Sequence, residues 1–205
     1  MYPTNEQLNK LILEVTKSSN NPDFIHQPWF VDYHLKIVQQ IALELINYYP
    51  KANKETAIAL TWIHDYGKTI DFKNQYETTY IKGKELMIEL GFSQDFTNKI
   101  INYAKTLDNH SNQNLSDAPI EVQIVSSADG CAHFVGPFMS IYWWENPQKT
   151  HKELMQSTVN KANKDWNHKI VLPEARKNFE SRYKYIIEQS GRFPKHFIKP
   201  YQANK

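Results

Sequence analysis

The chain has 205 residues, with 24 Lys and Arg against 22 Asp and Glu, and 40% of its residues are apolar. That length suits a single domain, and the apolar content supports a packed core, so wholesale disorder is excluded. The single cysteine, Cys131, excludes an internal disulfide framework and a cysteine zinc cluster. With a formal charge of only +2, no targeting signal and no long apolar run, we expect a cytoplasmic protein that binds neither nucleic acid nor a membrane.

Apolar residues recur with a helical period along the chain. Thr4-x-x-Gln7 is a capping box that predicts a first helix to about residue 18, and Pro28 suits the start of a second helix that Pro50 ends. Further helices are expected at 54–66, 75–90 and 93–107, from Pro119 past Asp129, near 150–167 and at 173–189. Because no stretch alternates like a strand, we predict an all-α fold. It forms one domain over residues 1–205, with a core of about 28–136 and a C-terminal helical extension of about 137–190.

Three of the expected helices turn a His or an Asp toward the core. His34 lies one turn before Val38 in an apolar stripe, His64 ends the stripe of the third helix, and Asp129 lies one turn after Val125. Any one of them alone is more often a satisfied core polar group. Buried imidazoles and carboxylates are nevertheless costly unless paired, hydrogen-bonded or bound to a metal ion. Together with the adjacent Asp65, the set favours a site for a divalent ion such as Mn, Fe, Co, Ni, Zn or Mg.

The segment from His34 to Lys68 resembles the opening of the HD-domain metal-dependent phosphohydrolase superfamily. In that family a His is followed by His-Asp at the end of a helix, often by x-Gly-Lys, and later by a distant Asp. The matching residues here are His34, the run His64-Asp65-Tyr66-Gly67-Lys68, and Asp129. The resemblance covers about residues 31–134. It implies an HD-type helical bundle, with C-terminal helices packed on it, in which His34, His64, Asp65 and Asp129 bind one divalent metal ion.

Binuclear members of the superfamily carry two further histidines between the His-Asp pair and the last Asp. The first of these positions is Thr79 in this chain, whereas His110 lies where the second is expected. A mononuclear site is therefore favoured, which counts against an HD-type iron oxygenase. The resemblance leaves His110 as a proton donor or a substrate contact, with a solvent-exposed loop histidine as the alternative.

The resemblance implies that the protein hydrolyses a phosphate ester of a nucleotide or other small metabolite with metal-activated water. Its catalytic candidates are Asp65, Lys68 and His110, with Lys68 supplying positive charge for the phosphoryl oxygens and His110 a proton. Lys68, His110 and His133 are the candidate substrate contacts. Lys68 is equally well read as a solvated lysine, and His133 as a core residue. The competing hypothesis is a non-catalytic HD-type module that binds a ligand or a protein partner.

An aromatic segment, residues 134–144, follows the last expected ligand. Aromatic faces can stack a nucleobase. We instead expect this segment to pack the C-terminal helices onto the core.

Overall fold

The computed structural model describes residues 2–109 and 114–198, and within these ranges the chain forms helices and turns without any strand. The all-α prediction is therefore confirmed. In chain order the α-helices are α1 (Asn5–Ser19), α2 (Lys36–Ile46), α3 (Lys54–Ile63), α4 (Gln75–Glu89), α5 (Gln94–Asp108), α6 (Ile120–Ala132), α7 (Phe138–Trp144), α8 (His151–Lys164) and α9 (Pro173–Gln189). Among the described residues, no helix has the length and apolar content needed to cross a membrane.

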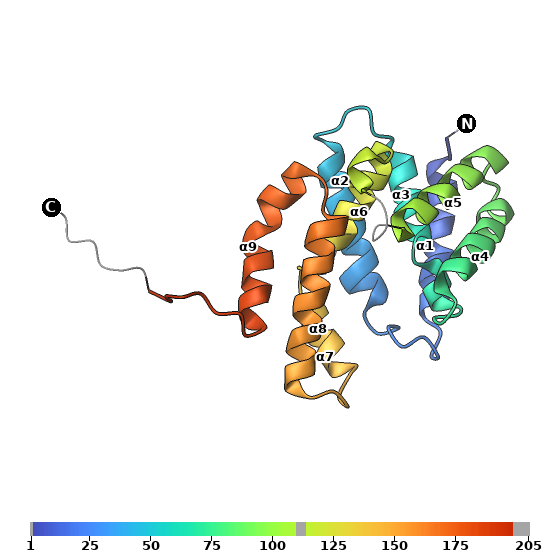
Figure 1. The fold of residues 1–205 in the computed structure, drawn as a ribbon. Coiled ribbons are helices and arrows are strands. Elements are labelled where there is room, and N and C mark those ends of the chain that lie inside the picture. The colour runs from blue at the N-terminus through green and yellow to red at the C-terminus, as the bar shows by residue number, and fades with distance from the viewer. Residues whose placement is uncertain (1, 110–113, 199–205) are drawn as a thin grey trace.

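Four shorter helical segments complete the described structure. Two are π-helical turns, Val31–Leu35 before α2 and Asp165–Lys169 after α8. Two are 3₁₀ turns, Tyr66–Thr69 and Leu115–Asp117. Figure 1 shows α2 and α6 in the middle of the molecule, with α1, α3, α4 and α5 on one side and α7, α8 and α9 on the other.

Local signals account for most of the helix ends. The side chains of Thr4 and Thr150 each form a capping box, at the starts of α1 and α8, and Ser93 caps α5. Several predicted ends are wrong, and one of them is the end of α2, which lies at Ile46 rather than next to Pro50. The second helix begins at the π-helical turn at Val31 rather than at Pro28, and the third ends at Ile63 because Asp65 leaves the helical conformation (φ −113°, ψ 11°).

Helix α6 lies between two hydrophobic cores. Its residues Val122 and Val125 pack into the core that α1, α3 and α5 share, whereas Ile124 and Ala128 face a second core shared with α2 and α9. Every residue from Glu121 to Ala132 except Gln123 is buried. A helix that is buried all round offers no solvated face, so Asp129 within it must find its partners inside the protein.

The turn after α3 is pressed against α4 at Gly67. A Cβ atom on Gly67 would meet Gln75 O at 2.0 Å and Thr79 N at 2.5 Å, so only glycine fits here. The Gly67 N–H donates a 2.8 Å hydrogen bond to Thr79 Oγ1. This contact fixes the turn that carries Lys68, and it gives Thr79 a packing role.

The segment that follows α8 is tied to α6 by small residues. Ser126 Oγ donates to Lys169 O at 3.0 Å, and Ser127 Oγ accepts from the backbone N–H groups of Val171 and Leu172. Gly130 lies beneath the same segment, where a Cβ atom would meet Ile170 Cγ1 at 2.8 Å. This close approach brings the C-terminal helices into contact with the helix that carries Asp129.

Candidate metal centre

The structure brings the four predicted ligands, His34, His64, Asp65 and Asp129, into one cluster in which each residue is at most 8% exposed. His34 Nε2 lies 3.7 Å from Asp65 Oδ2 and 3.4 Å from Asp129 Oδ1. His64 Nε2 lies 3.5 Å and 3.8 Å from the same two oxygen atoms. Atoms that bind one ion through bonds of about 2.0–2.2 Å lie about 3–3.5 Å from one another. The observed separations are close to that spacing.

Three helix termini deliver these side chains. His34 comes from the π-helical turn that leads into α2, His64 and Asp65 follow the last residue of α3, and Asp129 lies one turn before the end of α6. Single π-helical turns are frequent at functional sites, where they redirect a side chain. The cluster thus forms where α2, α3 and α6 meet.

The imidazole of His64 is oriented by the backbone. Its Nδ1 lies 2.8 Å from Thr61 O, and because a carbonyl oxygen only accepts, Nδ1 must carry the proton. In the neutral imidazole the lone pair of Nε2 then faces the two carboxylates, and this buried atom has no hydrogen-bond partner. Metal-binding histidines typically donate their second nitrogen to a carbonyl or carboxylate in this way. The donor set therefore fits a divalent ion.

Two lysines neutralise the carboxylates. Lys68 Nζ lies 2.5 Å from Asp65 Oδ2, and Lys169 Nζ pairs with Asp129 Oδ2. Burial would raise the pKa of both aspartates, but Lys68 and His64 hold the pKa of Asp65 well below its usual range, and Lys169 and His133 do the same for Asp129. Both carboxylates are thus ionised at neutral pH, as metal ligands must be.

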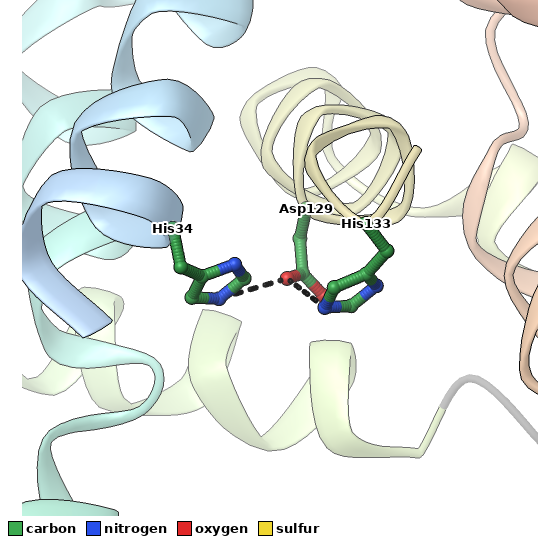
Figure 2. Close-up of side chains that lie close together, drawn as sticks. All are labelled: His34, Asp129 and His133. Carbon is green, nitrogen blue, oxygen red and sulfur yellow. Dashed lines mark ion pairs between the residues drawn. The ribbon is translucent and has the colours of Figure 1, made fainter. Parts of the chain in front are cut away.

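His133 also belongs to this cluster. Its Nε2 lies 3.6 Å from Asp129 Oδ1, and its Nδ1 lies 2.9 Å from Oδ2 of the fully buried Asp165. Lys161 Nζ completes this group at 2.8 Å from Asp165 Oδ1. Figure 2 shows His34 on one side of Asp129 and His133 on the other, both aimed at its carboxylate. The sequence anticipated His133 as a substrate contact, but the structure places its ring among the candidate ligands.

The charge states of three imidazoles differ in this cluster. Burial lowers the pKa of His34, and burial together with Lys161 lowers that of His133 to about 4, so both are neutral at pH 7. Burial would also lower the pKa of His64, but Asp65 and Asp129 outweigh it and raise the value.

Two overlapping groups have ligand atoms within 4.8 Å of one another, namely His34 with His64 and Asp65, and His34 with Asp129 and His133.

A cavity of about 60 Å³ adjoins the cluster, and both lysines line it together with Asp108 and Tyr76. Asp108 accepts a 2.7 Å hydrogen bond from the Tyr80 hydroxyl. Burial raises the pKa of Asp108 to about 6, so this carboxyl group gains and loses a proton close to neutral pH. The cavity therefore places two cations and one titratable acid beside the candidate metal ligands.

A larger cavity of about 650 Å³ lies on the other side of His133, among α7, α8 and α9. Its wall includes Trp143 and Met139 from the aromatic segment. Two residues of that segment make internal contacts, since Phe134 contacts the rings of Trp166 and Tyr183 and Trp143 Nε1 donates to Thr158 Oγ1, whereas Trp144 is exposed. These contacts agree with the expected packing of the C-terminal helices onto the core.

One predicted site residue lies outside the described part of the chain, and three residues near the site were not predicted. His110, the predicted proton donor, lies outside the described residues. Sequence reasoning missed Lys161, Asp165 and Lys169, which reach the site from the C-terminal extension. They recur every four residues and so share one helical face, which was the available signal.

Comparison of the chain with protein-family models, curated proteins and solved structures gives no match.

Proposed function

We propose that this chain is a metal-dependent phosphohydrolase that cleaves a phosphate ester of a nucleotide or another small metabolite. The observation that supports this most directly is the convergence of His34, His64, Asp65 and Asp129 at ligand-like separations in a buried cluster. When bound there, a divalent ion would polarise a phosphoryl oxygen and lower the pKa of a water molecule toward neutrality.

The charge balance of the site favours an anionic substrate. The negative charges of Asp65 and Asp129 are matched by Lys68 and Lys169, and the buried Asp165 is matched by Lys161. With the imidazoles neutral, as metal ligands must be, an added ion would leave two positive charges in excess while Asp108 is protonated and one when Asp108 is ionised. A phosphate monoester carries about two negative charges at neutral pH, so it complements this excess.

The two lysines are suited to hold a phosphoryl group. Both line the 60 Å³ cavity beside the ligand cluster, and the side chain of Lys68 is 27% exposed and that of Lys169 18% exposed. An ammonium group acts as a compact point charge that can stabilise the charge developing on phosphoryl oxygens. In this proposal Lys68 keeps the role that the sequence gave it, and Lys169 shares it.

Asp108 is a candidate to protonate the leaving group. It lies in the same cavity, and Tyr80 holds its carboxyl group in place through the hydroxyl hydrogen bond. A general acid works best when its pKa is near the working pH, and that of Asp108 is about 6. His110 remains the other candidate for this proton.

A substrate panel tests the proposal. Chelator-treated protein is assayed for release of inorganic phosphate from phosphomonoesters, nucleoside phosphates and cyclic nucleotides, with Mn²⁺, Co²⁺, Ni²⁺ or Mg²⁺ added back. We expect metal-dependent turnover that Asp65→Ala abolishes. Asp32→Ala is the matched control because Asp32 pairs with Lys36 at the surface, where its side chain is 65% exposed. Absence of turnover by metal-loaded protein across the panel would overturn the proposal.

One observation favours the alternative of a non-catalytic module that binds a ligand or a protein partner. Both cluster aspartates already have a lysine counter-ion, so the fold balances its buried charge without a metal. This alternative predicts that the protein purifies with little metal and that the His64→Ala variant still binds its ligand or protein partner. An HD-type iron oxygenase would need two irons, so a measured metal-to-protein ratio near one would contradict that function.

A further inference from the structure

We propose that His133 is an additional protein ligand of the same metal ion, and that Asp165 positions it. This assignment rests on the metal centre proposed above and extends it to a residue of the α6 C-terminus and a residue that follows α8. It adds a third imidazole to the two that the resemblance implies.

The first argument is geometric. His34 Nε2 and His133 Nε2 lie 3.4 Å and 3.6 Å from the same oxygen, Asp129 Oδ1. These distances are long for hydrogen bonds but close to the spacing of about 3–3.5 Å between atoms that bind one ion. The two imidazole rings are parallel, with 4° between their planes and 5.1 Å between their centres. Figure 2 shows both rings directed at the Asp129 carboxylate from two different helical segments.

The second argument is how His133 is held. Its Nδ1 lies 2.9 Å from Asp165 Oδ2, and the Asp165 side chain is 0% exposed. A carboxylate that accepts the N–H of a histidine fixes the ring and makes the opposite nitrogen a better ligand. The Thr61 carbonyl does the same for His64. Two imidazoles in the cluster thus have Nδ1 anchored from behind and Nε2 directed at the candidate ligand carboxylates.

The third argument is that the fold buries the Asp165 carboxylate, which costs free energy that its partners must offset. Burying a carboxylate is expensive unless it is paired, and Asp165 is paired with Lys161 Nζ at 2.8 and 2.9 Å while it contacts His133. Lys161 Nζ also lies 2.9 Å from His133 Nδ1, which permits a second tautomer with the proton on Nε2. Only the tautomer that donates Nδ1–H to Asp165 leaves the Nε2 lone pair free for a metal ion.

Phe138 covers part of this ring, while His133 also lines the cavity of about 650 Å³. The ring of Phe138 lies 4.3 Å from that of His133 and 6.1 Å from that of His34, measured between centres. His133 itself is 6% exposed. Partial shielding of this kind strengthens the attraction between a neutral imidazole and a cation, because fewer water molecules compete for either.

The test measures Co²⁺ binding rather than turnover. Chelator-treated protein is titrated with Co²⁺ in competition with a chromophoric chelator, and the visible absorption of the bound Co²⁺ is recorded. His133→Asn has a side chain too short to reach the site, whereas His133→Phe keeps the volume and the ring contacts without any nitrogen. We expect each to weaken Co²⁺ binding by at least about tenfold and to change the absorption spectrum, and Asp165→Asn to weaken it by about 10–100-fold.

His168→Ala is the matched control because His168 lies on the same π-helical turn as Asp165 and its side chain is exposed. It should bind Co²⁺ like the wild type, and thermal melting confirms which variants are folded. Unchanged affinity and spectrum in folded His133→Phe and His133→Asn would overturn the ligand assignment alone. Wild-type protein that binds Co²⁺ no better than His64→Ala would overturn the metal centre as well. Lost turnover with unchanged Co²⁺ binding would mark His133 as a proton-transfer group and not a ligand.

Discussion

Lys169 Nζ pairs with Asp129 Oδ2 across forty residues of sequence, and this ion pair joins the segment after α8 to α6 inside the candidate metal centre. The backbone makes the pair possible. Ser126 holds the carbonyl of Lys169, and Gly130 leaves room for Ile170. The C-terminal extension therefore contributes charge to the site as well as packing around it.

Removing this lysine should separate metal binding from phosphate binding. In Lys169→Met, loss of a cation beside Asp129 should tighten Mn²⁺ binding by about tenfold, because the repulsion between the two cations is removed. The kcat/KM for a phosphate ester should fall by about a hundredfold, since a charge on the phosphoryl oxygens is lost. Metal titration and steady-state kinetics measure the two effects, with the exposed Lys164→Met as control. Weaker metal binding in Lys169→Met would contradict this assignment of the charge.

The pH dependence of stability should change when Asp108 is replaced. The pKa of Asp108 is raised from 3.8 to about 6 in the folded protein, chiefly by burial. A raised carboxyl pKa contributes stability that is fully present below the unfolded value and is lost as pH rises through the folded value. In chelator-treated protein, Asp108→Asn should therefore be more stable than the wild type by about 1–2 kcal/mol above about pH 7.

The same difference should shrink toward about pH 4, where the wild-type carboxyl group is also neutral. Urea unfolding at a series of pH values measures it, and Asp117→Asn is the control because Asp117 is exposed. Stability curves for wild type and Asp108→Asn that run parallel with pH would contradict the raised pKa. If Asp108 is also the proton donor, the more stable variant will be the less active one.

Substitution of Gly67 should cost stability, whereas the same substitution at Gly83 should not. In Gly67→Ala the added Cβ would meet two backbone atoms of α4 at 2.0 and 2.5 Å, which neither helix nor turn can avoid without shifting. We expect a loss of about 2–4 kcal/mol. Gly83 lies inside α4, where a Cβ meets its nearest atom, Ile63 Cγ2, at 3.4 Å. Gly83→Ala should leave stability unchanged or raise it by about 1 kcal/mol. Equal effects at the two sites would argue against the close approach at Gly67.

Thr79 should behave as a structural residue. Thr79→Val keeps the side-chain shape but removes the oxygen that accepts the Gly67 N–H, leaving a buried donor unpaired. The expected cost is about 1–3 kcal/mol, and Thr79→Ser, which keeps the hydroxyl group, should recover most of it. Chemical unfolding measures both variants. A change in the number of metal ions bound by Thr79→Val, with stability intact, would instead point to a role in the metal centre.

The sequence predicted much of this fold because its helix ends are signalled locally. Thr4 caps the first helix as expected, Ser93 and Thr150 cap α5 and α8, and Gly91 has a positive φ of 81° after α4. Where packing overrides local preference, the prediction was wrong. The third helix stops at Ile63 so that Gly67 can meet α4, and no local residue signals that contact in advance.

The candidate site likewise contains residues that the sequence could predict and residues that it could not. His34, His64 and Asp129 could be found because a polar side chain on an apolar helix face is visible in the sequence. Asp165 and Lys169 could not be placed, because their position depends on the π-helical turn after α8 and on its contacts with α6. Those are tertiary relationships between segments about forty residues apart. The four-residue spacing of these side chains indicates a shared helical face, but not which helix that face contacts.

Calorimetric titration of chelator-treated protein with Mn²⁺ tests the central claim most directly, because it measures both the number of ions and their affinity. We predict saturation at one ion per chain in the wild type, with binding lost in His64→Ala and in Asp65→Asn and retained in Asp32→Ala. Failure of the wild type to bind Mn²⁺, or binding that His64→Ala and Asp65→Asn leave intact, would contradict the metal centre and the phosphohydrolase proposed from it.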